Sequence, residues 1–264
     1  MKKTLLICGV LLAFAVPAFA QPYSAGVDLH WTDCVLGAGV TDMANTCTAN
    51  TGSVGAMTAS FVPPGFMPLY EANLSLFDLQ TSAATLSPWW HMETGGCPNR
   101  VGRINTSAAF TGPCQDFWQG TATTAILYST PSPGLLTPNS ARFKAVAGVA
   151  EASAGPIDNA DYTTTPPTPY VWYALNVNIL KNGTLPTTVC GGCLDGACIV
   201  LNEMFLSQPA PVPDVRLSTP CGAPGARNYV TYRGGAATHG GQCPGDPPTP
   251  THKTTWGSVK SLYR

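Results

Sequence analysis

Short runs in which apolar and polar residues alternate recur along this chain, and they favour strands over helices. In the run YVWYALNVNIL, one face of a strand would carry Val171, Tyr173, Leu175, Val177 and Ile179. The opposite face would carry Trp172, Ala174, Asn176 and Asn178. ARFKAVAGVA alternates in the same way, with Phe143, Ala145, Ala147 and Val149 opposite Arg142 and Lys144.

Glycine and proline interrupt the chain too often for long helices, with 27 Gly and 25 Pro in 264 residues. No segment has a sustained helical stripe, although residues 81–90 could hold one short helical turn and residues 256–264 a terminal helix. Many short strands separated by turns predict an all-β, disulfide-stapled β-sandwich or jelly-roll-like domain of about nine to ten strands.

A change of composition suggests where this domain ends. Pro209, Pro211 and Pro213 alternate with other residues and favour an extended connector. We therefore predict a sandwich over residues 22–211 and a small segment over 213–264 that is clamped by cysteines and packs on the sandwich.

The N-terminus has the pattern of a secretory signal peptide. Lys2 and Lys3 precede an apolar stretch, and Ala18-Phe19-Ala20 forms an A-x-A cleavage signal, so cleavage is expected after Ala20. This pattern predicts a secreted bacterial protein, periplasmic or extracellular. The remaining sequence has no long apolar run, so we expect no membrane insertion.

The charge content argues against some partners. Charged residues make up 10% of the chain, compared with roughly 25% in an average domain. Such a surface has no basic patch for nucleic acid or for anionic lipid.

Cysteines are expected to form disulfides in an oxidising compartment. Ten occur, and Cys8 lies in the signal peptide, so nine remain. Pairing between sequence neighbours predicts Cys34–Cys47, Cys97–Cys114 and Cys221–Cys243, each contributing roughly 3 kcal/mol. In the segment CGGCLDGAC, Cys198 would pair with Cys193 or Cys190, and the remaining cysteine would be a free thiol or would link two chains.

Two other interpretations of CGGCLDGAC are weaker. A thioredoxin-like dithiol needs a helix after the first cysteine, but the strand-like run IVLNEMFL follows. A structural zinc site needs four ligands, and no histidine is near. A disulfide staple is therefore the favoured interpretation.

Catalytic motifs are absent from the sequence. The four histidines, at positions 30, 91, 239 and 252, do not occur in an HExxH motif, and no GxSxG motif occurs. A glycosidase pair could be drawn from Glu71, Asp78, Glu93 and Asp116, but acids that cap turns are the simpler interpretation. We expect a protein that is not an enzyme, with a secreted hydrolase as an alternative.

No cofactor is expected, with calcium as a weak exception. Asp158 and Asp161 offer oxygen ligands in a loop. The spacing lacks the D-x-D-x-D-G pattern, and an Asx-turn is the competing interpretation.

Two groups of aromatic residues are candidates for ligand binding: Trp89 and Trp90, and Phe117 and Trp118. A Cys97–Cys114 disulfide would bring them close together. If exposed, their rings could stack on sugars or anchor a protein. The competing interpretation is that they pack in the core.

The segments LHWTDC, SLFDLQTSAATLSPWW, CQDFWQG, CGGCLDGACIVLN, RNYVTYRGG and TTWGSVKSLYR resemble a group of uncharacterised secreted bacterial proteins with no assigned activity. The resemblance covers most of the mature chain and implies no catalytic residue. More loosely, the order of strands is similar to that of cohesin-like and carbohydrate-binding-like sandwiches, which is an analogy of fold only.

These observations predict a non-catalytic surface, matrix or envelope-associated module that binds a protein or a glycan. A structural subunit of an extracellular assembly is an alternative, since self-association through an uncovered strand edge would suit it.

Overall fold

The structure is a computed structural model, and it describes residues 22–49, 52–91, 104–105, 114–129, 137–180 and 190–235. The expected signal peptide with its cleavage point at Ala20, the expected terminal helix, Cys97 and Cys243 lie outside these residues.

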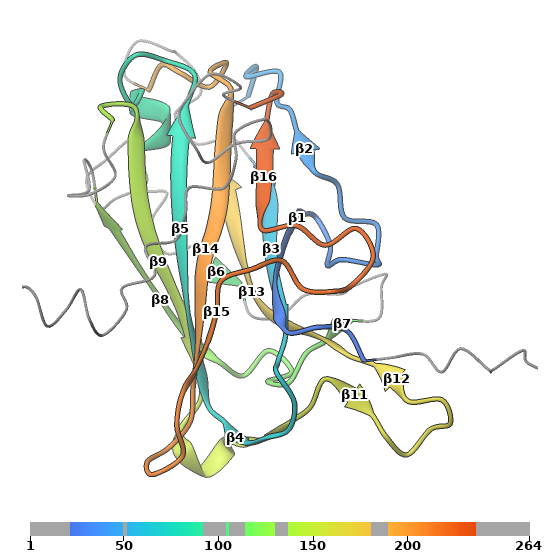
Figure 1. Cartoon of the computed structure of the whole chain (residues 1–264). Coiled ribbons are helices and arrows are strands. Elements are labelled where there is room, and N and C mark those ends of the chain that lie inside the picture. The colour runs from blue at the N-terminus through green and yellow to red at the C-terminus, as the bar shows by residue number, and fades with distance from the viewer. Residues whose placement is uncertain are drawn as a thin grey trace, which may run out of the picture.

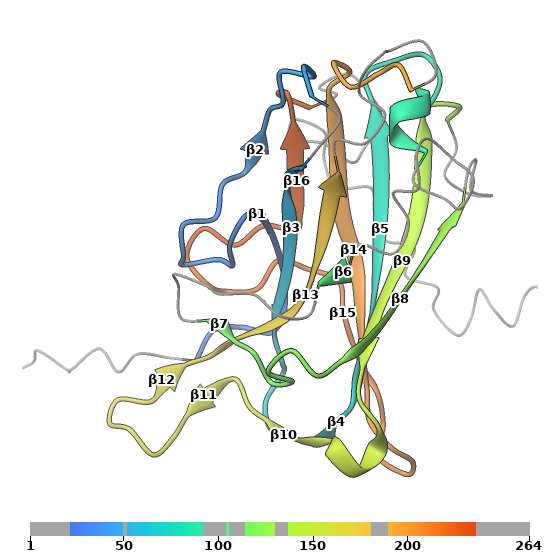
Figure 2. The same ribbon diagram turned by 180° about the vertical axis from the view of Figure 1, so that it is seen from behind.

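Two β-sheets pack face to face, which confirms the all-β sandwich (Figures 1 and 2). The larger sheet has the strand order β2-β16-β14-β5-β9-β8, with β15 also paired to β14. Its strands are β2 (Asp42–Met43), β5 (Ala72–Thr81), β8 (Thr123–Ser129), β9 (Ser140–Gly148), β14 (Ala197–Ser207), β15 (Val215–Leu217) and β16 (Tyr229–Tyr232). The smaller sheet has the order β1-β3-β13-β6, with β7 also paired to β13. Its strands are β1 (Gly26–Trp31), β3 (Ser53–Val62), β6 (Ile104–Asn105), β7 (Cys114–Gln115) and β13 (Val171–Leu180).

Two short strand pairs extend one end of the sandwich. β4 (Met67–Tyr70) pairs with β10 (Gly155–Ile157), and β11 (Ala160–Asp161) pairs with β12 (Thr168–Pro169). The β11–β12 hairpin projects away from both sheets (Figure 1). With these pairs the described residues contain sixteen strands, and the excess over the predicted number consists of strands of two to four residues. The two helices in the described part of the chain are three-residue 3₁₀ turns, η1 (Pro88–Trp90) and η2 (Glu151–Ser153).

Alternation in β9 places its apolar side chains in the core as predicted. Phe143, Ala145 and Ala147 are fully buried, and Phe143 stacks on Phe77 of β5 with ring centroids 4.7 Å apart. Burying a side chain as large as phenylalanine contributes roughly 1.5–3 kcal/mol. The two sheets are therefore held together mainly by apolar contacts between their inner faces.

The single apolar face predicted for 171–179 is wrong, because a β-bulge interrupts β13. The register with β3 shifts between Tyr173 and Leu175. After the bulge Leu175, Val177 and Ile179 enter the main core, whereas Val171 before it belongs to a second apolar cluster on the outer face of the smaller sheet. A bulge adds one residue to one strand, so the side chains on either side of it exchange faces.

The described part of the expected C-terminal segment is built into the larger sheet. β15 pairs with β14 over Val215–Leu217, and β16 pairs with β14 over Tyr229–Tyr232. Cys221, which lies between these two strands, is a free thiol. The expected Cys221–Cys243 clamp is therefore wrong.

Short segments cover several sheet edges. Along β1, Val27 and Leu29 donate their N–H groups to the carbonyls of Thr219 and Arg227, at 2.8 and 2.7 Å. Cys221 donates its N–H to the carbonyl of Val27 at 2.9 Å. β2 covers the edge of β16, and β6 and β7 cover that of β13. We call residues 219–227, which run along β1, the covering segment.

None of the described helices has the length and apolar character needed to cross a membrane.

Candidate functional site

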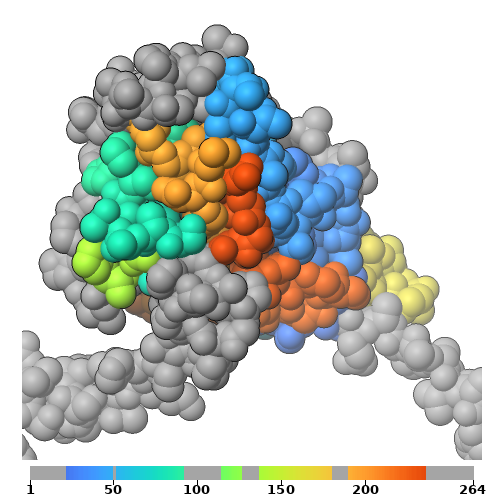
Figure 3. Space-filling view, turned by 90° about the horizontal axis from the view of Figure 1, so that it is seen from above, coloured from blue at the N-terminus to red at the C-terminus, as the bar shows by residue number. Residues whose placement is uncertain are grey.

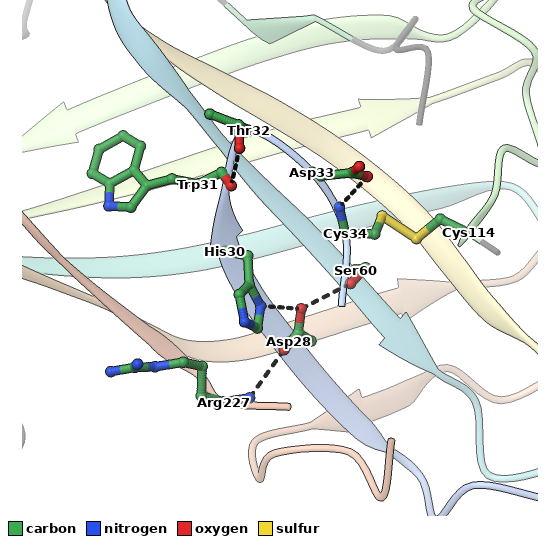
Figure 4. Close-up of polar contacts among 9 residues, drawn as sticks. All are labelled: Asp28, His30, Trp31, Thr32, Asp33, Cys34, Ser60, Cys114 and Arg227. Carbon is green, nitrogen blue, oxygen red and sulfur yellow. Dashed lines mark hydrogen bonds and ion pairs between the residues drawn. A yellow bond between two sulfur atoms is a disulfide. The ribbon is translucent and has the colours of Figure 1, made fainter. Parts of the chain in front are cut away.

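The closest approach of a histidine to a carboxylate in the described residues is on the outer face of the smaller sheet. Val27, Leu29 and Trp31 of β1 point into the core, so the alternate residues Asp28 and His30 point outward. Nδ1 of His30 lies 2.9 Å from Oδ2 of Asp28 (Figure 4).

The Asp28 carboxylate is fully buried and has two further hydrogen-bond donors. The Ser60 hydroxyl donates to Oδ2 at 3.3 Å, and the backbone N–H of Arg227 donates to Oδ1 at 3.0 Å (Figure 4). Burial lowers the pKa of the Arg227 guanidinium, which lies 3.7 Å from the centroid of the Tyr229 ring. A buried carboxylate is stable only when it is paired and hydrogen-bonded, and these partners meet that need.

A loop and a disulfide cover this polar face. The Asp33 carboxylate accepts the N–H groups of Cys34 and Ala38, at 2.7 and 3.1 Å, which orders the loop after β1. Gly39 of this loop lies so close to His30 that a Cβ would come within 2.9 Å of the His30 Cβ. The Cys34–Cys114 disulfide then ties the loop to β7 (Figure 4). His30 is therefore 6% exposed.

This geometry favours a structural role for the Asp28–His30 pair. A catalytic triad needs the serine hydroxyl hydrogen-bonded to the histidine, but the Ser60 hydroxyl is bonded to the aspartate and is fully buried. Among the residues that the structure describes, no group of three or more His, Cys, Asp or Glu side chains is placed to hold a metal ion. The sequence interpretation missed Asp28 and Ser60, although the alternation in GVDLHW places Asp28 and His30 on one face.

Two of the other candidate acids, Asp78 and Asp116, form structural ion pairs or hydrogen bonds. Asp78 forms a bidentate ion pair with Arg142, at 2.7 and 2.8 Å, and also accepts the side-chain amide of Asn202. Asp116 accepts the N–H groups of Trp118 and Gln119, both at 3.0 Å, and burial raises its pKa above the ordinary value.

The predicted cysteine pairing is wrong for every pair that the structure describes. Cys34 bonds to Cys114 and Cys47 bonds to Cys193, so neither the predicted Cys34–Cys47 nor the predicted Cys97–Cys114 disulfide forms. Among the described cysteines the free thiol is the buried Cys221, because Cys190 and Cys198 are also disulfide-bonded. Pairing between sequence neighbours fails because the sheets bring distant segments together: the two disulfides span 80 and 146 residues.

The segment CGGCLDGAC is a staple, as predicted, but it joins more distant elements than expected. Seen along the strands, the loop before β14, residues near η1, the chain around β2 and the end of β16 gather at one end of the sandwich (Figure 3). Cys193 links this loop to Cys47, and the Tyr232 hydroxyl donates to the Cys193 carbonyl at 2.9 Å. The Ser87 hydroxyl donates to Asp195 at 2.5 Å.

Three of the four predicted aromatic binding residues are buried, and the two groups pack in different places. Trp89 and Trp90 are fully buried and pack on Tyr232, with ring centroids 5.5 and 5.3 Å away. Trp118 is 3% exposed and stacks on Tyr70 of β4 at 5.0 Å. Phe117 is half-buried. The two groups therefore pack on different aromatic residues, Tyr232 and Tyr70, and the Cys97–Cys114 disulfide predicted to bring them together does not form, because Cys114 bonds to Cys34.

The calcium candidates form turns. Asp158 Oδ1 accepts the N–H of Asn159 at 2.7 Å, and Asp161 Oδ1 accepts the N–H and the hydroxyl of Thr163 at 2.9 and 2.6 Å. These are the local side-chain contacts of Asx-turns. The geometry of these two carboxylates is therefore that of turn residues, and it gives no support for a calcium site.

Comparison with protein-family models, with curated proteins and with solved structures finds no match.

Proposed function

We propose that this protein is an exported, non-catalytic module that binds a protein at the cell surface through the β11–β12 hairpin. Two disulfides indicate an oxidising compartment, and the A-x-A motif ending at Ala20 supports export through a signal peptide. The observation that carries the binding role is a rigid hairpin whose tip is solvent-exposed.

The tip of the hairpin exposes five consecutive residues, 162–166. Tyr162 is 58% exposed, although an aromatic ring of this size is usually at least half covered. Exposed tyrosines are frequent energetic anchors of protein interfaces. The tip therefore has the composition of a contact surface.

Hydrogen bonds hold the tip in one conformation. Thr164 donates its hydroxyl to the Asp161 carbonyl at 2.9 Å and accepts the N–H of Thr168, also at 2.9 Å. The Tyr162 hydroxyl donates to Oδ1 of Asn159 at 2.8 Å. At the base, the Trp172 indole donates to the Asp158 carbonyl at 2.6 Å. A contact surface that is ordered before binding loses less conformational entropy when it binds.

Charge indicates what kind of surface the hairpin would meet. Hydrogen bonds from Thr163 hold the pKa of Asp161 below its ordinary value, so this carboxylate is ionised at neutral pH. No lysine or arginine occurs between Lys144 and Lys181, whereas Glu151, Asp158 and Asp161 do. A partner with a basic surface would complement this charge.

A binding assay on cells of the producing organism tests this proposal. Labelled mature protein is sedimented with the cells, and Tyr162→Ala is compared with Leu194→Ala, a matched change at another exposed apolar residue that lies in the loop before β14. We expect Tyr162→Ala to weaken binding at least about tenfold and Leu194→Ala to leave it unchanged. Equal binding by both variants would rule out the hairpin.

Pretreatment of the cells distinguishes the two classes of partner. Protease treatment should abolish binding, and added salt should weaken it. Loss of binding after periodate oxidation instead would show that the partner is a glycan and would contradict the proposal.

A further inference from the structure

We infer that β8 is a self-association edge, at which β8 of a second copy of this chain pairs antiparallel to extend the larger sheet across a two-fold axis. This inference does not depend on the binding role of the hairpin, which is a separate element of the fold.

The first support is that β8 is the longest described strand at the edge of either main sheet; β2, β6, β7 and β15 also pair with one strand each but are only two or three residues long. Within the described residues β8 (Thr123–Ser129) hydrogen-bonds to β9 alone. The edges of β1, β16 and β13 are covered by the covering segment, by β2, and by β6 and β7. An edge strand directs half of its backbone N–H and C=O groups away from its neighbour, and such a row is a template for another strand.

The second support is the sequence of β8, which lacks the usual protection of an edge. TTAILYS contains no charged residue and no proline, whereas lysine or proline commonly blocks pairing at exposed edges. Threonine, isoleucine, leucine and tyrosine are well suited to strands. The sequence of β8 therefore contains none of the residues that commonly block pairing at an edge.

The absence of charge favours a second copy as the occupant. In a two-fold antiparallel pair centred on Ile126, Thr123 would oppose Ser129 and Ala125 would oppose Leu127. Every residue would meet an uncharged residue, so the symmetric arrangement brings no like charges together. Such a pair uses the same surface on both copies and closes as a dimer.

The third support is that the core is incompletely covered at β8. Ala145 and Ala147 of β9 are fully buried, but Thr124 and Ile126, which alternate with the exposed Thr123 and Ala125, are half-buried. Ile126 packs against the main core. A strand added beside β8 would cover the exposed part of this side chain.

Sedimentation velocity of the mature protein, from micromolar to millimolar concentration, tests the inference. We expect a reversible monomer–dimer equilibrium. Residue 125 opposes residue 127 of the other copy, so the two residues 125 are diagonal neighbours on the same face, within reach of long side chains. Ala125→Lys and Ala125→Glu each place like charges at these diagonal positions, and each should raise the dissociation constant at least about tenfold, or about 1.4 kcal/mol. Ser218→Lys, an exposed position outside β8, adds the same charge and should leave the equilibrium unchanged.

Mixing the two Ala125 variants in equal amounts should restore the dimer, because the diagonal positions then carry opposite charges. If Ala125→Lys lowers the melting temperature, Ala125→Glu alone is used for the test. A wild-type protein that stays monomeric would overturn the inference, as would a dimer that survives both Ala125 variants or a mixture that stays monomeric. A dimer that disappears under reducing conditions would also overturn it, because it would be linked through cysteine.

Discussion

Arg227 donates its backbone N–H to Oδ1 of Asp28, across 199 residues of sequence and at 3.0 Å. The contact fixes the end of the covering segment to β1, beside the hydrogen bond from Leu29 to the Arg227 carbonyl. A fully buried carboxylate on β1 thus holds a distant part of the chain against the strand edge. The edge is thereby closed to pairing with another chain.

Asp28→Asn should destabilise the fold by roughly 1.5–3 kcal/mol. The carboxylate accepts hydrogen bonds through both oxygens, whereas an amide has one acceptor and turns a donor toward His30, Ser60 or Arg227. Urea denaturation followed by circular dichroism measures the loss. Ser60→Ala is the control and should cost about 1 kcal/mol; a smaller effect for Asp28→Asn than for Ser60→Ala would contradict this role.

Cys221 should be unreactive in the folded protein. Burial raises the pKa of its thiol to about 11, so little thiolate is present at neutral pH. We expect iodoacetamide to label the peptide that contains Cys221 only after denaturation without reductant. Rapid labelling of the native protein, or a disulfide at Cys221 in the peptide map, would show that this account is wrong.

Removal of the Cys47–Cys193 disulfide by a double substitution to alanine should cost about 2–5 kcal/mol. The disulfide closes a loop of 146 residues, and it ties the chain near β2 to the loop before β14. Thermal unfolding of the double variant, beside Cys221→Ala as a control that breaks no cross-link, measures the effect. Equal melting temperatures for the two variants would contradict the expectation.

Asp116→Asn should change how stability depends on pH. Burial raises the pKa of Asp116, despite the opposing hydrogen bonds from Gln119 and Trp118. The folded state therefore holds this proton more tightly than the unfolded state. The protonated carboxyl then contributes to the free energy of unfolding, and this contribution is fully present below the ordinary pKa of about 3.9. It is lost as pH rises through the folded value. Wild type should become less stable relative to Asp116→Asn between acidic and neutral pH in chemical denaturation; the opposite trend would refute this.

Part of the fold could be read from local patterns. Alternation in β9 placed Phe143, Ala145 and Ala147 on the core face, because a strand without a bulge keeps a period of two. In β13 the same pattern misled, because the bulge near Ala174 leaves no mark in the alternation itself. The sequence around Trp89 and Trp90 did not indicate whether their side chains are buried or exposed. Their burial depends on η1 folding against the loop before β14, where Trp89 donates its N–H to the Gly191 carbonyl at 3.0 Å.

The sequence by itself determined that the chain forms strands and that most of its cysteines are oxidised, because side-chain period and cysteine content are properties of short segments. Only the tertiary structure decided which cysteines bond, where Asp28 finds its partners and which strands lie at the ends of the two sheets. All three features depend on which distant strands become neighbours, and the packing of the two sheets determines which strands do.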